Sequence, residues 1–187
     1  MCILSNRWIY EKVQSLIKKH KTRDPDELIH LLNIKVFLLS DTKHLLGMYQ
    51  VIQRNRCIFI STDVGRQKDL ILAHELGHDQ LHRDQVISGV AFHENGLFVD
   101  NSKNELEANI FAAHLLIADE DIIPLLRGQI DDVDLSYELG VDINLVNLKI
   151  SEMVKLGLLN LNECCVERPR GDFLKNYRPD KDDWSEC

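Results

Sequence analysis

The sequence His74-Glu75-Leu76-Gly77-His78 constrains this chain more than any other stretch. Residues four apart lie one above the other on a helix, so both histidines can turn an imidazole nitrogen toward one metal ion. Glu75 then lies beside that ion, where its carboxylate can take a proton from a metal-bound water, whose pKa is lowered to about 7. The spacing therefore predicts a helix that holds a hydrolytic zinc ion.

The alternative interpretation is that the two histidines form a polar stripe on a surface helix. The flanking residues are apolar, however, both in the run 70–73 and at Leu76 and Leu81. The helix is therefore expected to be largely buried, and a buried imidazole needs a partner. Asp79 departs from the pattern, because the position after the second histidine is more often uncharged in such helices.

A catalytic zinc ion usually has three protein ligands and one open position. Residues 101–117 have apolar residues at helical spacing and offer two carboxylates, Glu105 and Glu107. Because these lie two residues apart on a helix, only one of them can point at the metal. Glu105 aligns with Asn109 one turn later, whereas Glu107 aligns with Lys103 in what looks like a solvated charge pair. We predict Glu105 as the third ligand and keep Glu107 as the fallback.

Asn109 is an amide among apolar neighbours, and a buried amide needs a hydrogen-bonding role. Orienting a ligating histidine through its second ring nitrogen would supply that role. For Glu105 a structural alternative stays open, in which Ser102 and Glu105 form a capping box at the start of the helix. His82 lies two turns after His74, so it either contacts the substrate carbonyl or oxyanion or only completes the surface.

Together the two motifs closely resemble the ImmA/IrrE family of zinc metallopeptidases. The resemblance is carried by residues 72–78 with Leu81-His82, and by residues 105–116 in the form Glu-x-Glu-Ala-Asn-x-Phe-Ala-Ala-x-Leu-Leu. It extends over residues 25–157. Ala118 departs from it, since relatives often have proline after the paired leucines.

The resemblance implies His74, His78 and Glu105 as ligands of Zn²⁺ and Glu75 as the catalytic carboxylate. It also implies a site-specific endopeptidase that cleaves a helix-turn-helix transcriptional repressor, inducing mobile-element or stress-response genes. The alternative hypothesis is a zinc-stabilised binding module that sequesters a repressor without cutting it. Manganese or iron in the same ligands is also open.

The order of the elements predicts an α+β fold. Apolar periodicity predicts a helix over residues 8–17, and Asp24-Pro25 starts a second helix that ends near Leu32. The predicted strands cover residues 34–39, 48–52 and 57–61, with a polar hairpin turn at 53–56. The domain is therefore expected to be mostly helical, with a small antiparallel sheet beside the zinc helix and a gluzincin-like core.

We expect three parts along the chain: a metallopeptidase core at 1–130, a C-terminal helical subdomain at 131–157 and a loosely packed tail at 158–187. The subdomain has the form of a helix-turn-helix, but its basic residues are only Lys149 and Lys155. We therefore favour packing or substrate docking over DNA reading there. Residues 83–100 are either a strand and loop beside the cleft or a connector.

The formal net charge of −8 disfavours direct binding of nucleic acid, and it could steer the protein toward a basic partner such as a repressor. Five cysteines without a Cys-x-x-Cys pair do not resemble a disulfide framework. Neither a signal-peptide pattern nor an apolar run of membrane-spanning length is present. These features predict a cytoplasmic protein without membrane contact.

Overall fold

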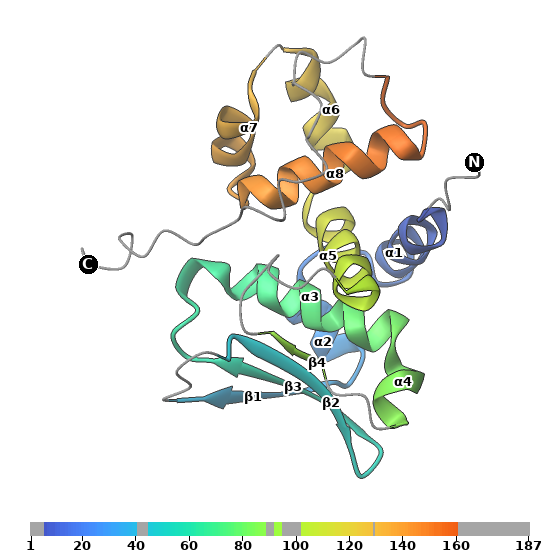
Figure 1. Cartoon of the computed structure of the whole chain (residues 1–187), viewed down its shortest axis with the longest axis vertical. Helices are drawn as coiled ribbons and strands as arrows, with labels where there is room; N and C mark the ends of the chain where they lie inside the picture. Colours follow the sequence, from blue (N-terminus) through green and yellow to red (C-terminus); the bar gives the residue numbers. More distant parts are fainter. Residues whose placement is uncertain (1–5, 41–44, 89–91, 95–101, 129, 161–187) are drawn as a thin grey trace.

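The computed structural model of the chain describes residues 6–40, 45–88, 92–94, 102–128 and 130–160. The described helices are α1 (Arg7–His20), α2 (Pro25–Leu31), α3 (Lys68–Leu81), α4 (Arg83–Ile87), α5 (Lys103–Leu116), α6 (Asp119–Arg127), α7 (Asp132–Leu139) and α8 (Ile143–Lys155), with a 3-10 turn η1 (Gly65–Gln67). The strands are β1 (Lys35–Leu39), β2 (Gly47–Ile52), β3 (Asn55–Ser61) and β4 (Phe92–Glu94). In Figure 1 the sheet lies at one end of the molecule and α6, α7 and α8 at the other, with α3 and α5 between them. The predicted fold class, mostly helical α+β, is confirmed.

The sheet has the strand order β1-β3-β2-β4. Strands β2 and β3 form the predicted hairpin, but its turn is shorter than predicted: only Gln53 and Arg54 connect the strands, both with positive φ, as in a two-residue turn. β4 pairs antiparallel with β2, whereas β1 pairs parallel with β3. The sheet is therefore mixed rather than wholly antiparallel, because the chain crosses from β1 to the far side of β3. Strand propensity indicates a strand at β1 but not its partner.

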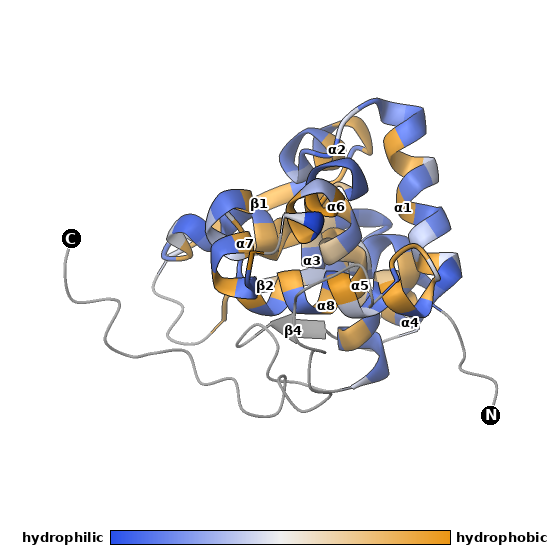
Figure 2. Cartoon of the chain, turned by 90° about the horizontal axis from the view of Figure 1, so that it is seen from above, coloured by the Kyte–Doolittle hydropathy of each residue, from blue (hydrophilic) through white to orange (hydrophobic). Residues whose placement is uncertain are grey.

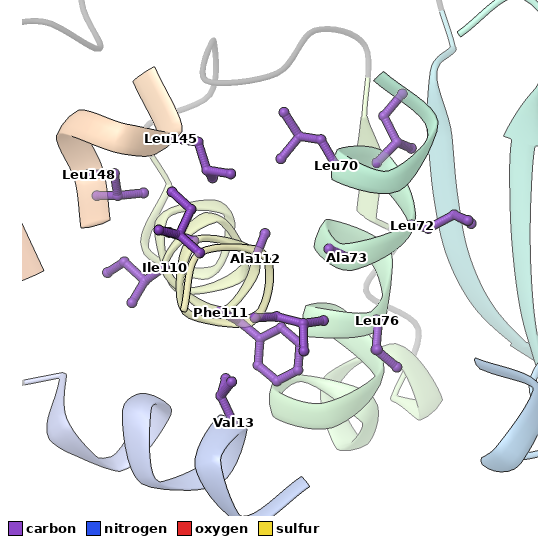
Figure 3. Close-up of a cluster of buried hydrophobic side chains, with 14 of the residues drawn as sticks. Val13, Leu70, Leu72, Ala73, Leu76, Ile110, Phe111, Ala112, Leu145 and Leu148 are labelled. Carbon is purple, nitrogen blue, oxygen red and sulfur yellow. The ribbon is translucent and has the colours of Figure 1, made fainter. Parts of the chain in front are cut away.

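Helix α5 is the centre of the hydrophobic core. It packs against α1, α3 and α8, and its residues from Glu107 to Leu115 are buried. Figure 2 shows hydrophobic and hydrophilic residues on different sides of the outer helices, so that apolar faces are available to this core. Figure 3 shows the side chains that meet around α5: Val13 of α1, Leu70, Ala73 and Leu76 of α3, Ile110, Phe111 and Ala112 of α5, and Leu145 and Leu148 of α8.

Helices α3 and α5 approach closely where Gly77 meets Ala108. A Cβ atom on Gly77 would lie 3.1 Å from Ala108 Cα and 3.3 Å from Phe111 Cβ, which leaves little room for any side chain. Glycine within a helix costs about 1 kcal/mol relative to alanine, so close packing is the gain that offsets it. Because Glu105 lies one turn before Ala108, this close approach also brings Glu105 toward the histidines of α3.

The two C-terminal helices are joined by a glycine turn. Asp131 caps α7 at its start, and Gly140 ends it in the left-handed conformation, with φ 64°. Helix α8 packs on α5 and buries Lys149, whose ammonium lies 2.5 Å from Asp119 Oδ1. This lysine is therefore inside the fold rather than on its surface.

Most of the predicted tail at 158–187 lies outside the described residues, as do residues 89–91 and 95–101 of the connector. No helix in the described part of the chain is long and apolar enough to span a membrane.

Candidate metal centre

Three buried side chains from α3 and α5 converge on one point. His74 Nε2 lies 3.0 Å from His78 Nε2 and 3.0 Å from Glu105 Oε2, and His78 Nε2 lies 3.4 Å from the same oxygen. Ligand atoms 2.0–2.1 Å from a tetrahedral zinc ion would be separated by about 3.3 Å. The three atoms therefore have the spacing of one face of a zinc coordination shell, and they form a candidate metal-binding group.

Hydrogen bonds behind the two histidines orient their rings. Asn109 Oδ1 lies 2.9 Å from His74 Nδ1, where it can accept that nitrogen's proton. His78 Nδ1 lies 3.1 Å from His82 Nδ1, and His82 Nε2 lies 3.0 Å from Glu107 Oε2. An ionised Glu107 can only accept, so His82 donates from Nε2 and accepts from His78 at Nδ1. Both His74 and His78 then carry their proton on Nδ1 and direct the lone pair of Nε2 toward the same point.

With these tautomers, the atoms that converge are two imidazole lone pairs and one carboxylate oxygen. All three are acceptors, so bringing them within 3.4 Å of one another is unfavourable unless a cation lies among them. The donor set, two nitrogens and one oxygen, is one that catalytic zinc uses. The residues present therefore fit the metal that the sequence predicts.

The protonation states suit a divalent cation. Burial lowers the pKa of His78 from 6.5 to about 4, so the ring stays neutral near neutral pH. For Glu105, burial acts to raise the pKa, whereas N–H groups of His74 and His78 directed at the carboxylate would lower it. With the tautomers above, the two Nε2 atoms present lone pairs instead, so a cation among the three atoms is what would favour the ionised carboxylate. Metal ligands must be deprotonated, and a neutral His78 meets that requirement.

The position of Glu107 differs from the sequence prediction. Its ion pair with Lys103 is present at 3.6 Å, but the carboxylate is buried rather than solvated and accepts a hydrogen bond from His82. Helical spacing identified Lys103 as a neighbour, but it could not show that α3 covers this side of α5. His82 is itself buried with protein partners at both ring nitrogens, so the geometry favours a role in holding His78 over contact with a substrate oxyanion.

The sequence left open whether Glu105 serves in a capping box with Ser102 or as a metal ligand. Ser102 is the N-cap of α5, and its side chain accepts from the backbone nitrogen of Glu105 at 3.4 Å. The carboxylate of Glu105 lies against His74 and His78. Capping of the helix and placement of the acid in the metal centre are therefore compatible.

Glu75 projects from α3 toward β2, where Gly47 makes room for it. A Cβ atom on Gly47 would lie 2.6 Å from Glu75 Oε1 and 2.7 Å from Ile71 Cγ2. No ordinary side chain fits at this position in the present arrangement. The sequence predicted a strand from residue 48 but carried no signal of this contact, because Gly47 and Glu75 are distant along the chain.

Asp79, the charged residue that departs from the apolar pattern, is the buried acceptor of a polar cluster. Its carboxylate accepts from the hydroxyl of Tyr49 at 2.7 Å, from Arg56 at 3.1 Å and from Arg83 at 3.0 Å. Burial and Asp79 raise the pKa of Tyr49, so this hydroxyl stays protonated and donates. The cluster ties α3 to β2 and β3 one turn after Glu75.

Comparison with known proteins agrees with this geometry. The model of a peptidase family described as the IrrE N-terminal-like domain matches residues 30–151. The uncharacterized immunity region protein 2 of Bacillus phage phi105 is 33% identical over 143 residues, which cover 75% of this chain and 89% of that protein. Metallopeptidase ImmA of Bacillus subtilis (strain 168) is 29% identical over 130 residues, which cover 67% of this chain and 75% of that protein.

Proposed function

The chain belongs to the ImmA/IrrE family of metallopeptidases, and from this we propose that it is a zinc-dependent endopeptidase that cleaves a helix-turn-helix transcriptional repressor. His74, His78 and Glu105 would hold the metal, and Glu75 would be the catalytic carboxylate. The observation that carries the proposal is the convergence of three acceptor atoms within 3.4 Å, next in sequence to a buried glutamate.

Zinc, when bound, supplies Lewis acidity that polarises a peptide carbonyl and lowers the pKa of water. Glu75 acts as general base by accepting a proton from the attacking water, and as general acid by donating that proton to the amine nitrogen when the peptide C–N bond breaks. Asn109 keeps His74 in its orientation, while His82 and Glu107 do the same for His78. Gly47 leaves the space that the carboxylate of Glu75 needs.

A repressor as substrate is supported by two observations. One relative is named as an immunity region protein of a phage, and a repressor is the kind of protein that we propose such a region controls. The net charge of −8 favours encounter with a basic, DNA-binding partner through long-range attraction. We propose a cytoplasmic site of action for the same reason, since a repressor bound to DNA is found there.

The direct test is co-expression of the Glu75→Gln variant with a helix-turn-helix repressor from the same genome. The variant should keep its zinc, because Glu75 is not a ligand, and should leave the repressor whole. The Glu105→Ala variant should lose both zinc and cleavage, with metal content measured on the purified proteins. Cleavage by Glu75→Gln would remove Glu75 from the mechanism. A full biological effect of Glu75→Gln without fragments would instead favour sequestration of the repressor.

A further inference from the structure

Strand β2 runs alongside α3 and α4, and its alternate residues contact successive turns of these helices. Gly47 faces Glu75, and the hydroxyl of Tyr49 donates to Asp79. Val51, two residues further, lines a cavity together with Arg83 and Ile87 of α4. The strand therefore leads directly from the catalytic carboxylate to this cavity.

The cavity lies between the β2–β3 hairpin and α4, at the end of the molecule away from α6 (Figure 1). It has a volume of about 400 Å³. Three of its lining residues are cationic and two are apolar: Arg54, Arg56, Arg83, Val51 and Ile87. Three guanidinium groups in one cavity are unexpected on a chain of net charge −8.

The buried carboxylate of Asp79 neutralises only part of this charge. Arg56 and Arg83 both bind its Oδ2 atom, at 3.1 and 3.0 Å, and the same oxygen accepts from Gln80 at 2.7 Å. The carboxylate is thus saturated, and the three arginines with Asp79 carry two net positive charges. Within the described part of the chain, the buried Nε of Arg83 has no hydrogen-bond partner. The cavity therefore keeps a net positive charge that favours an anion, and the exposed guanidinium of Arg54 can donate to it.

The distance from Glu75 matches that of a side chain in an extended peptide. Val51 is four residues from Gly47 along β2, which corresponds to about 13 Å at 3.3 Å per residue. Arg83 is eight residues from Glu75, which corresponds to about 12 Å along a helix. An extended peptide covers this distance in about four residues. Val51 and Ile87 offer apolar surface for a residue beside the anionic one.

We propose that this cavity is a specificity subsite that binds an acidic side chain of the protein substrate, about four residues from the cleaved bond. Guanidinium groups recognise carboxylates through paired N–H donors, which gives geometric as well as electrostatic selection. Overall negative charge attracts a basic partner, while this cavity selects one acidic residue within it. The identity of the ligand as substrate rests on the proposed function, whereas the chemistry of the cavity does not.

The test measures binding without catalysis, using the full-length, zinc-loaded Glu75→Gln protein. The probes are the peptide acetyl-Ala-Glu-Leu-Ala-amide, the same peptide with Gln in place of Glu, and inorganic phosphate. Binding is followed by the NMR signal of the Arg83 Nε–H group. We expect the Glu peptide to shift this signal to saturation and the Gln peptide to bind at least about tenfold more weakly.

Arg54 supplies the variant, because it is exposed in the hairpin turn and its replacement leaves the Asp79 cluster intact. Arg54→Glu should weaken binding of the Glu peptide by about tenfold or more, while the matched Arg127→Glu change on α6 should leave it unaltered. Equal binding of the two peptides, no binding of either, or indifference to Arg54→Glu would overturn the proposal. Tighter binding of phosphate than of the Glu peptide would assign the cavity to a small anion instead.

The same variants separate failure of the subsite from failure of the proposed function. If Glu75→Gln cleaves the repressor but the Glu peptide binds, the mechanism is wrong and the cavity stands. If the repressor is cut only by the native protein but no acidic residue lies about four positions from the cut, the subsite is wrong. In that cleavage assay we expect Arg54→Glu to raise KM while leaving kcat nearly unchanged.

Discussion

Gly47 is the residue whose replacement tests the site most sharply, because its missing side chain provides the space that Glu75 occupies. In the Gly47→Ala variant the new Cβ atom would lie 2.6 Å from Glu75 Oε1 and 2.7 Å from Ile71 Cγ2. Non-bonded heavy atoms settle at about 3.5 Å, so the carboxylate or the strand must move by roughly 0.5–1 Å. The variant should therefore displace Glu75, the proposed general base, without touching any of the three proposed metal ligands.

The size of the effect follows from that displacement. A misplacement of about 1 Å can reduce a rate by about 100-fold, so we expect kcat to fall by roughly 30- to 100-fold. Overpacking costs about 1–3 kcal/mol, and the lower entropy of the unfolded chain returns about 0.4–1 kcal/mol. The free energy of unfolding should therefore drop by about 1–2 kcal/mol. Zinc content should stay at the native level.

The assay combines a time course of repressor cleavage with metal analysis and urea unfolding. In a Glu75→Asp background the shorter side chain leaves room for the Cβ atom, so Gly47→Ala should cost much less activity there than in the native protein. Gly128→Ala, which adds the same methyl group after α6, is the matched control and should leave kcat unchanged. Full activity of Gly47→Ala, or an equal loss in both backgrounds, would refute the argument that the methyl group acts through Glu75.

Two further predictions concern buried groups around the core of the site. Glu107→Gln removes the charge that holds His82 and should weaken zinc affinity by about 10- to 100-fold in a competition titration. The control is Lys103→Ala, which removes an exposed partner of the same carboxylate and should change zinc affinity little. Equal effects of the two changes would show that Glu107 does not help to hold His78 in place. Burial, with Lys149 nearby, lowers the pKa of His114 from 6.5 to about 3, so the unfolded chain takes up a proton there before the folded protein does. The free energy of unfolding of the zinc-free protein should therefore fall as pH drops from 6.5 toward 3, by at most about 1.4 kcal/mol per pH unit from this group. Urea titrations at about pH 7 and about pH 5 measure how steeply the free energy of unfolding changes with pH. This pH dependence should become shallower in His114→Gln but not in the control His30→Gln, which changes an exposed histidine. An unchanged pH dependence in His114→Gln would contradict the prediction.

The parts of the site that the sequence could predict are those fixed by the period of a single helix. His74 and His78 face one point because they are four residues apart, and Glu105 and Asn109 share a face of α5 for the same reason. The contacts that the sequence could not predict join residues far apart in the chain. Tyr49 and Asp79, 30 residues apart, meet only because β2 lies along α3. Likewise, the sequence of α5 alone suggests that Glu107 is solvated, because it does not show that α3 covers this side chain.

The placement of β2 links Glu75, the proposed catalytic residue, to the proposed subsite. Side chains on a strand alternate between faces, so a shift of β2 by one residue would turn Gly47, Tyr49 and Val51 away from α3 together. The hydrogen bond from Tyr49 to Asp79 lies between the other two contacts and is buried, where a missing partner would be costly. Asp79 thereby fixes the register of the strand relative to the helix. A single charged residue, out of place in an apolar helix by sequence alone, positions both the space for Glu75 and the arginines of the cavity.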